Sequence, residues 1–418
     1  EITIDGAYAI GMLAKGSKLV NTKTISSTNV KNGIGIVGIG ATVENRGTIK
    51  VVGTGNTNNV GVFLNKSSTG TVGTGGTPSV DVSGNNSVGV FTVDNKGTIS
   101  TLTMRGNVKV SGNGISGIVA KGGSQVTLTG AANVTVDNNG SVSSPIGTRG
   151  SYGVVVQGSS SKFEGNDTTV NAKITNPESI GLYSGGSLTV NKANITAANG
   201  ALNFYADNGK IEIRNGGITE TGQKSLLFYA KGASANIKLS GGTLNATIKG
   251  GSTPSTRGTA FYYEGTGNTF NKTAIENYFK NTFGNGTTST LGHLNLNMEA
   301  GSRLFVASNV SMNLSDTNPT GISAALGLGG LTGSNYKTFM LYLSELVVNH
   351  AVDLNDPNSA YNQLEIANSS IKNADTITGT NNRQVAMAQE NGNKPDGTGY
   401  DPGEVTLTNT AVGTIDLT

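Results

Sequence analysis

The feature that most constrains the fold of this chain is a short apolar segment that recurs along it. Most copies lie 22 to 28 residues apart, and many carry glycine beside the central hydrophobic residue. The copies are IGML at 10–13, IGIV at 34–37, VGVF at 60–63 and at 88–91, SGIV at 116–119, YGVV at 152–155, IGLY at 180–183, LNFY at 202–205, LLFY at 226–229 and TAFY at 259–262. Such a period is typical of solenoid proteins, in which one repeat cannot bury its apolar face alone.

A second element follows many of these segments and consists of Asn with Gly-Thr-Ile or a close relative. It occurs as NRGTI at 45–49, NKGTI at 95–99, NNGSV at 138–142 and NGGI at 215–218. Apolar and polar residues alternate within the segments, which is the period of a β-strand. Gly and Asn between the strands tolerate left-handed backbone and therefore suit corners. The repeats predict an all-β chain that forms a right-handed parallel β-helix.

The composition supports this fold class and excludes several others. The 418 residues include 62 Gly, 13% are charged and 35% are hydrophobic, which does not fit a helical bundle, a collagen or a charge-driven disordered chain. The 29 basic and 26 acidic residues are scattered, so no nucleic-acid partner is expected. The absence of Cys excludes disulfides and thiolate metal sites. It is compatible with export of an unfolded chain and equally with simple non-use.

The alternation within the apolar segments assigns residues to the two faces of each strand. One set of positions is apolar in every copy and is expected to point inward: Met12, Ile36, Val62, Val90, Ile118, Val154, Leu182, Phe204, Phe228 and Phe261. The next position then points outward, and six copies carry an aromatic residue there: Phe63, Phe91, Tyr183, Tyr205, Tyr229 and Tyr262. We therefore predict an outer aromatic ladder.

The regular coils are interrupted after residue 270. The segment 273–284 has helical spacing, with Thr273 and Glu276 in a capping-box pattern and Gly284 as a stop. We predict regular β-helix coils over 1–270, an inserted helix and loop over 271–290, and further coils with an irregular or helical interruption over 291–378. Residues 379–418 are expected to form a loop and the start of a further coil. Periodicity does not decide between helix and strand for 336–348.

The motifs that could carry catalysis or bind a cofactor are weak. The Gly-x-Gly-x-x-Gly matches at 33–38 and 112–117 lie inside β repeats, whereas a dinucleotide site needs a strand-to-helix turn. His293 and His350 stand alone, and Asp396, Asp401 and Glu404 lack the spacing of known calcium loops. No Asp or Glu recurs at one position over three coils, as a polysaccharide-cleaving β-helix would need. We expect no enzyme activity, no metal and no cofactor.

The longest apolar stretch, 339–348, contains Ser344 and Glu345 and has about half the length that a bilayer requires. Membrane insertion of this segment is therefore not expected.

Three stretches carry a resemblance to a known family. IGIVGIGATVENRGTIKV, SVGVFTVDNKGTIS and the later YKTFMLYLSELVVNHAVDLNDPNSAYNQLEIANSSI resemble passengers of classical, monomeric type V autotransporters, and more narrowly the large fusobacterial outer-membrane adhesins. The similarity covers nearly the whole chain. It implies display at the bacterial cell surface, outside the outer membrane, and attachment to host cells or partner bacteria. A galactose-type host glycan or a surface protein would be the receptor, and the chain would be a monomer.

The resemblance transfers no catalytic residues, so candidate binding residues follow from the predicted surface. Outward aromatic side chains can stack on sugar faces or anchor a protein contact. The candidate partner-binding residues are Tyr183, Tyr205, Tyr229, Tyr262, Tyr278 and Phe279. Two alternatives remain: the ladder stacks only on itself, or the inserted helix covers it. Two other functions also remain, a passive spacer in a larger passenger and a carbohydrate-active β-helix enzyme.

Overall fold

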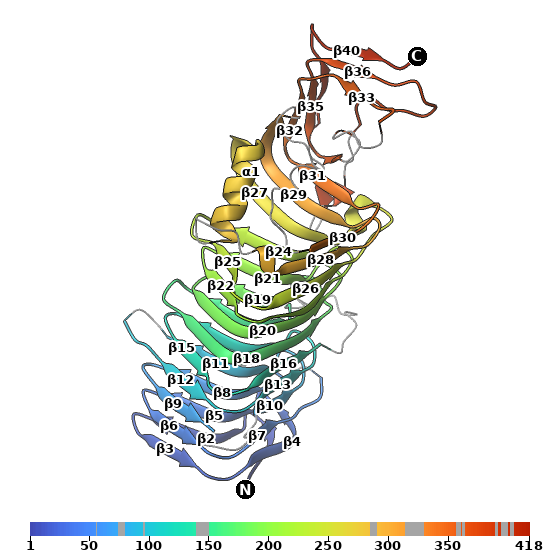
Figure 1. Cartoon of the computed structure of the whole chain (residues 1–418). Helices are drawn as coiled ribbons and strands as arrows, with labels where there is room; N and C mark the ends of the chain where they lie inside the picture. Colours follow the sequence, from blue (N-terminus) through green and yellow to red (C-terminus); the bar gives the residue numbers. More distant parts are fainter. Residues whose placement is uncertain are drawn as a thin grey trace. The chain divides into compact units, whose positions relative to one another are not determined.

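The computed structural model describes residues 1–55, 57–73, 80–94, 97–138, 150–284, 291–313, 330–356, 361, 364–388, 392–393, 400–401 and 405–418. The chain divides into two compact units. The N-terminal unit comprises Glu1–Thr219 and Ala230–Leu244, and the C-terminal unit comprises Glu220–Tyr229 and Asn245–Thr418. Both consist of coils whose strands pair in parallel with the equivalent strands of the next coil (Figure 1). The predicted all-β, parallel β-helix fold class is confirmed.

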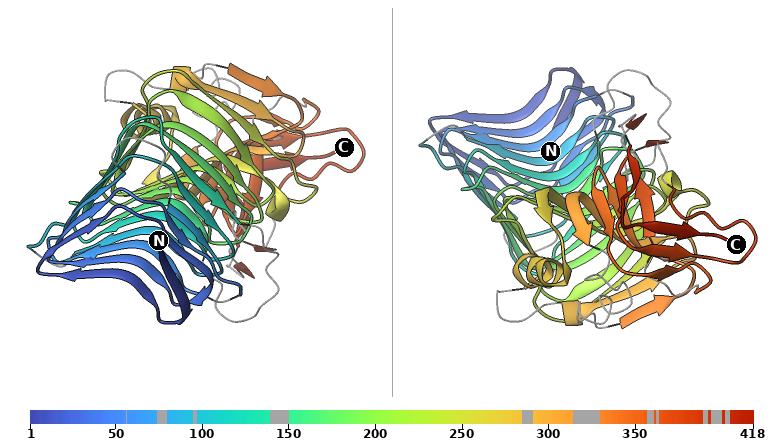
Figure 2. Two further views of the ribbon diagram at one scale, coloured as in Figure 1. Left: turned by 90° about the horizontal axis from the view of Figure 1, so that it is seen from below. Right: turned by 90° about the horizontal axis from the view of Figure 1, so that it is seen from above.

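Each coil of the N-terminal unit has three faces, and the strands of one face lie side by side (Figures 1 and 2). Face one contains the recurring apolar segments: β2 (Ile10–Lys15), β5 (Ile34–Ile39), β8 (Val60–Asn65), β11 (Val88–Val93), β14 (Ser116–Lys121), β17 (Tyr152–Gln157), β19 (Ile180–Ser184) and β21 (Leu202–Asp207). Face two contains β3 (Lys18–Asn21), β6 (Thr42–Asn45), β9 (Thr69–Val72), β12 (Thr101–Met104), β15 (Gln125–Leu128), β22 (Lys210–Ile213) and β25 (Asn236–Leu239). Face three contains β1 (Ile2–Ala7), β4 (Ile25–Lys31), β7 (Ile49–Val51), β10 (Val80–Ser83), β13 (Val108–Ser111), β16 (Asn133–Asp137) and β23 (Gly216–Thr221). Two long strands, β18 (Lys162–Ile174) and β20 (Ser187–Ala197), continue through a corner of the coil, so each contributes its first part to face two and its second part to face three.

The predicted inward residues of face one form the core of these coils. Ile36, Val62, Val90, Ile118, Val154, Leu182 and Phe204 in this unit are each 0% exposed. Met12, in the first coil of the chain, is only half-buried. Stacking like residues in register buries apolar area in every coil, which is the main stabilising term of such a fold.

The glycine that marks the recurring segment is required by a close approach between coils. A Cβ on Gly35 would lie 2.6 Å from the carbonyl oxygen of Gly61 and closer still to Cγ2 of Ile49. On Gly89 it would lie 2.6 Å both from the Gly117 carbonyl oxygen and from Cγ1 of Val108. A larger side chain at these positions would push the next coil away, which explains the glycine beside the inward residue in the copies from β2 to β19.

The described part of the C-terminal unit continues the same plan and includes the α-helix α1. Its elements are β24 (Leu226–Lys231), β26 (Thr243–Ile248), η1 (Pro254–Thr256), β27 (Thr259–Thr269), α1 (Lys272–Thr282), η2 (Leu291–His293), β28 (Leu294–Met298), β29 (Arg303–Asn313), β30 (Gly330–Gly333), β31 (Lys337–Tyr342), β32 (Glu345–Val348), β33 (Val352–Asp353), β34 (Leu364–Ala367), β35 (Ser370–Asn373), β36 (Thr376–Thr378), β37 (Gly392–Asn393), β38 (Tyr400–Asp401), β39 (Leu407–Asn409) and β40 (Thr414–Asp416). Strands β23, β24 and β26 each contain residues of both units.

The predicted helix forms, but its cap differs from the prediction. The side chain of Asn271 accepts a hydrogen bond from the Ala274 amide at 2.9 Å, so Asn271 is the N-cap and the capping box of Thr273 and Glu276 is wrong. The helix ends at Thr282 with Phe283 as its C-cap, so the predicted stop residue Gly284 directly follows the cap, the usual place for a terminating glycine. Its apolar face packs inward, because the ring of Phe283 lies 5.5 Å from that of Phe228.

Residues 336–348 form strands β31 and β32 rather than a helix, and both pair in parallel with β29. Near the end of the chain, β39 pairs in parallel with β35 and β40 pairs in parallel with β36. No helix in the described parts of the chain is long and apolar enough to cross a bilayer.

Candidate functional site

The outward positions of face one form a single row in the N-terminal unit. From β8 to β21 the row reads Phe63, Phe91, Val119, Val155, Tyr183 and Tyr205. The rings of Phe63 and Phe91 lie 5.6 Å apart, and those of Tyr183 and Tyr205 lie 5.4 Å apart, both in edge-to-face geometry. The predicted outer ladder is therefore present, but two valines divide it into two aromatic pairs.

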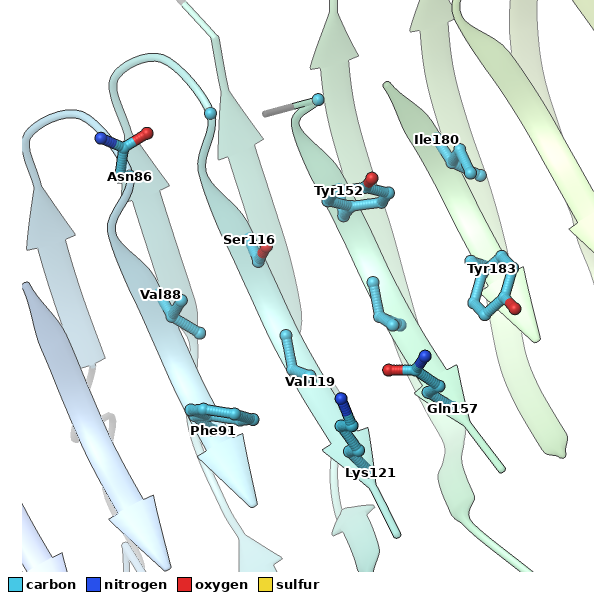
Figure 3. A pocket seen from close by; sticks show the side chains of 13 residues that line it. Asn86, Val88, Phe91, Ser116, Val119, Lys121, Tyr152, Gln157, Ile180 and Tyr183 are labelled. Atoms are coloured by element: carbon cyan, nitrogen blue, oxygen red, sulfur yellow. The ribbon is translucent and has the colours of Figure 1, made fainter. Parts of the chain in front are cut away.

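An open groove with a volume of about 400 Å³ lies where the valines replace aromatic rings. Its lining comes from four consecutive strands and their corners (Figure 3): Asn86, Val88, Phe91, Gly114, Ser116, Val119, Lys121, Gly150, Tyr152, Val155, Gln157, Ile180 and Tyr183. Val119 and Val155 are short and half-buried, and they occupy the row between Phe91 and Tyr183. The groove thus has an aliphatic floor and an aromatic ring at either end of the row.

Both end rings are held in place from outside the groove. Phe63 contacts the far side of Phe91, and Tyr205 contacts Tyr183 in the same way. The Tyr183 hydroxyl also donates a hydrogen bond to Oδ2 of Asp207 at 3.4 Å. Burial, and next the neighbouring Asp207 carboxylate, raise the pKa of Tyr183 above its ordinary value, so its hydroxyl stays a neutral donor. Rings fixed in this way lose little conformational entropy when a ligand binds.

Polar side chains border the groove on both sides. Asn86 sits at a corner with φ of 57°, a left-handed conformation that Asn tolerates. On the other side, Lys121 and Gln157 occupy equivalent positions at the ends of β14 and β17, and both are exposed. Within the described residues, Lys121 makes no ion pair. The groove therefore offers amide groups and one unpaired ammonium group around an apolar floor.

Among the predicted site residues, Tyr183 is the one that lines the groove. Tyr205 supports it from behind. In the C-terminal unit, the rings of Tyr229 and Tyr262 lie 5.0 Å apart in edge-to-face geometry, and the Tyr229 hydroxyl donates a hydrogen bond to Oε2 of Glu264 at 2.7 Å. Tyr262 also packs against a buried outer cluster of Val306, Met340, Tyr342 and Ala367. These two tyrosines serve packing within their own unit.

The two candidates on the inserted helix point toward the protein. Phe279 is 2% exposed and its ring contacts Phe261 and Phe305 at 5.0 and 5.5 Å, so its prediction as a partner-binding residue is wrong. The physical reason is that α1 uses its apolar face to close the core. Tyr278 is half-buried and donates a hydrogen bond to the Tyr262 carbonyl oxygen at 3.2 Å, and burial raises the pKa of its phenol.

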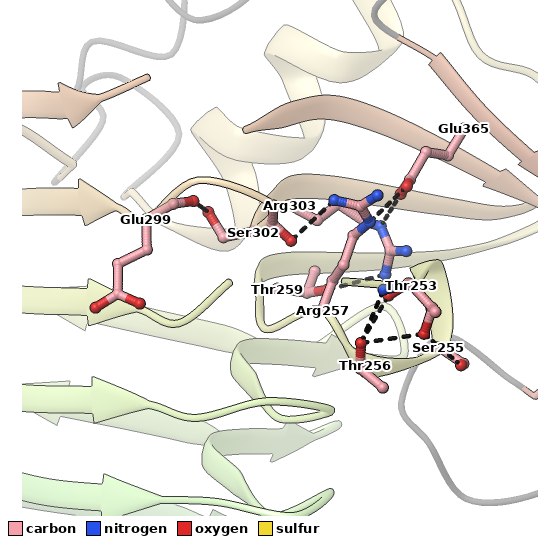
Figure 4. A network of polar contacts seen from close by, with 10 residues as sticks. Thr253, Ser255, Thr256, Arg257, Thr259, Glu299, Ser302, Arg303 and Glu365 are labelled. Carbon is pink, nitrogen blue, oxygen red and sulfur yellow. Dashed lines mark hydrogen bonds and ion pairs between the residues drawn. The ribbon is translucent and has the colours of Figure 1, made fainter. Parts of the chain in front are cut away.

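A cluster of charged side chains lies within the C-terminal unit and was not foreseen (Figure 4). Oε2 of Glu365 accepts a hydrogen bond from Nε of Arg303 at 2.8 Å, and its Oε1 lies 2.6 Å from Nε of Arg257 without hydrogen-bond alignment. Arg303 is fully buried and also donates to the Thr259 hydroxyl at 3.3 Å. With one carboxylate held by two guanidinium groups, the cluster has the composition of a structural ion network rather than of an acid–base pair.

The described residues also contain no group of three or more His, Cys, Asp or Glu side chains placed to hold a metal. Of the acidic loop considered above, Asp396 and Glu404 lie outside the described residues.

The groove itself was missed at the sequence level, although its signal was present. Residues 119 and 155 are the valines that follow the inward residue in SGIV and YGVV, where the neighbouring copies carry Phe or Tyr. A break in an aromatic row between two aromatic pairs predicts a gap of ring size on the surface. Comparison of this chain with protein families, curated proteins and solved structures found no match.

Proposed function

We propose that this chain is a segment of a bacterial surface adhesin, the passenger of a classical autotransporter, that attaches the cell to a host cell or to a partner bacterium. The observation that carries the proposal is the groove on the outer surface of the N-terminal unit, with its aliphatic floor, fixed rings and polar border. Such an arrangement suits recognition of a glycan or of a protein side-chain cluster. The repeat pattern, the absence of Cys and the low charge are features shared with autotransporter passengers.

The receptor is proposed to be a galactose-type glycan or a surface protein, bound by a monomer without a cofactor or metal. The chain would act outside the outer membrane, and its binding would need no nucleic acid. A catalytic role has less support, because sugar cleavage by carboxylates needs a pair of acids that flank the substrate, and the groove lining holds none.

The purified chain tests the proposal directly. We expect it to bind epithelial cells or partner bacteria in a saturable manner, and a glycan array to report at least one glycan. A variant with Tyr183→Ala should bind less, whereas Tyr8→Ala, at a side chain that is 77% exposed, should bind as the parent does. If the folded parent binds neither cells nor glycans, the chain is a spacer. Release of sugar from a glycan substrate would instead indicate an enzyme.

A further inference from the structure

The groove cannot recognise a peptide by adding a strand to its floor. Strand β14 pairs with β11 on one side and with β17 on the other, and β17 pairs in turn with β19. All backbone donors and acceptors of the two middle strands therefore face neighbouring strands, whereas strand addition needs an exposed sheet edge. A ligand here meets side chains only.

Those side chains combine the contacts that sugars require. The rings of Phe91 and Tyr183 stand at the two ends of the floor, and the aliphatic floor between them suits the C–H face of a pyranose ring. The amides of Asn86 and Gln157 can each donate and accept hydrogen bonds, as vicinal hydroxyl groups demand. The span from Phe91 to Tyr183 is three strand spacings, about 14 Å at about 4.8 Å each. One spacing is close to the length of one pyranose unit, so the groove fits a short oligosaccharide laid across the strands.

The charge of the groove restricts the chemical class of the ligand further. Lys121 is the charged side chain among the lining residues, none of which is an Asp or Glu. Figure 3 shows Lys121 beside Gln157 at the same edge of the groove. An exposed ammonium group without an ion pair among the described residues is the complement of a carboxylate on the ligand.

We propose that this groove binds a short oligosaccharide that carries a carboxylate, with its sugar rings over Val119 and Val155 and its carboxylate against Lys121. The proposal rests on the adhesin function and names the chemical class of its ligand. Sialic acids and uronic acids both supply such a carboxylate, and the two sources are distinguished by whether the chain binds sialyllactose or a galacturonate trisaccharide.

The first test fills the groove without disturbing the coil. In the double variant Val119→Phe, Val155→Tyr the outer row becomes continuously aromatic, as it already is in the coils on both sides. The variant should keep the circular dichroism spectrum and melting temperature of the parent or melt higher, since added edge-to-face rings stabilise the row. We expect it to lose binding of sialyllactose or of a galacturonate trisaccharide, measured by calorimetry on the whole chain.

The second test addresses the carboxylate. Lactose lacks the carboxylate of sialyllactose and should bind more weakly to the parent. Lys121→Gln should weaken binding of the acidic probe about fivefold, the upper end for an exposed charge pair, and leave lactose unchanged. Lys109→Gln, at another exposed lysine of the same unit, is the matched control and should change neither affinity. Raising the salt concentration should reduce the difference between the two probes.

The outcomes separate this proposal from the function on which it rests. If the folded, filled variant still binds the acidic probes, the groove is not their site. If the parent binds cells through the groove but no acidic sugar competes, and binding survives removal of cell-surface glycans, the ligand is a protein. Equal effects of the two lysine variants would also overturn the proposal, while cell binding would stand. Failure of the parent to bind any cell or glycan would contradict both the adhesin function and the acidic oligosaccharide as its ligand.

Discussion

Glu365→Gln should be the most destabilising single loss of charge in the C-terminal unit. Its carboxylate stands between Arg303, whose side chain is 0% exposed, and Arg257, whose side chain is 13% exposed. Glutamine has nearly the same shape, so the substitution removes the negative charge and leaves two guanidinium groups next to a neutral amide. Removing one partner of a buried ion network costs about 3–5 kcal/mol, because the remaining charge is uncompensated.

A matched control uses the same substitution at an exposed pair. Nζ of Lys162 lies 2.8 Å from Oε2 of Glu164, but the two side chains are 44% and 32% exposed. An exposed pair contributes at most about 1 kcal/mol, so Glu164→Gln should change the free energy of unfolding by less than that. The contrast between the two variants isolates the effect of burial from the effect of charge removal.

Hydrogen exchange resolves the effect locally, which matters because solenoid units need not unfold together. A loss of about 3 kcal/mol should lower the protection of amides in β27, β29 and β34 by about two orders of magnitude. The triple variant Arg257→Met, Arg303→Met, Glu365→Leu should regain most of the loss, since replacing a whole buried network by apolar side chains is often neutral. Equal losses in the free energy of unfolding for Glu164→Gln and Glu365→Gln would refute the reasoning. A triple variant that is less stable than Glu365→Gln would also refute it.

Three other predictions follow from the packing and the titratable pairs. Gly35→Ala should cost about 1–3 kcal/mol in a denaturant titration, because its Cβ would meet a backbone oxygen at 2.6 Å, whereas Gly292→Ala, with open space around it, should stay within about 0.5 kcal/mol. Phe279→Ala should cost about 3–5 kcal/mol in the same assay, and an unchanged midpoint would mean that α1 does not close the core. The hydrogen bond from Lys249 lowers the pKa of Glu299 below its ordinary 4.5, so this pair stabilises the fold above that pH and the contribution disappears as the pH falls through the lowered pKa. Because both side chains are more than a third exposed, the effect should be well below 1 kcal/mol, and it should vanish in Lys249→Met.

The repeating parts of the fold could be predicted from the sequence, because each coil has the same alternation of inward and outward residues. The inward register of Val62, Val90 and Phe204 follows from alternation alone. The outer ladder follows from the next position in the same strands. In a parallel β-helix, burial and strand pairing are set by equivalent positions, so a local pattern carries long-range information.

The parts that break the repeat were harder to predict, because competing local signals looked alike. Asn271 and Thr273 are both residue types that cap helices well. The residue at which the preceding strand pairing ends decides which of them is the N-cap. Phe270 is fully buried and its amide still donates to the Ser311 carbonyl oxygen at 2.9 Å, so Asn271 is the first residue free to cap. The pairing of Arg303 with Glu365 depends on residues 62 positions apart, across insertions that hide the register.

The proposed binding site lies inside regular coils rather than where the repeat is broken. The inserted helix interrupts the repeat, but Phe279 and its C-cap Phe283 are buried in the core. The groove arises inside regular coils, from side-chain size at one position of the row. Backbone pairing is unchanged at Val119 and Val155, so the sheet continues through these coils while their surface has a gap. Under the proposed function, exchange of aromatic and aliphatic residues along a single outer row would change what a β-helix recognises, while the ring pairs on either side hold the walls of the gap in place.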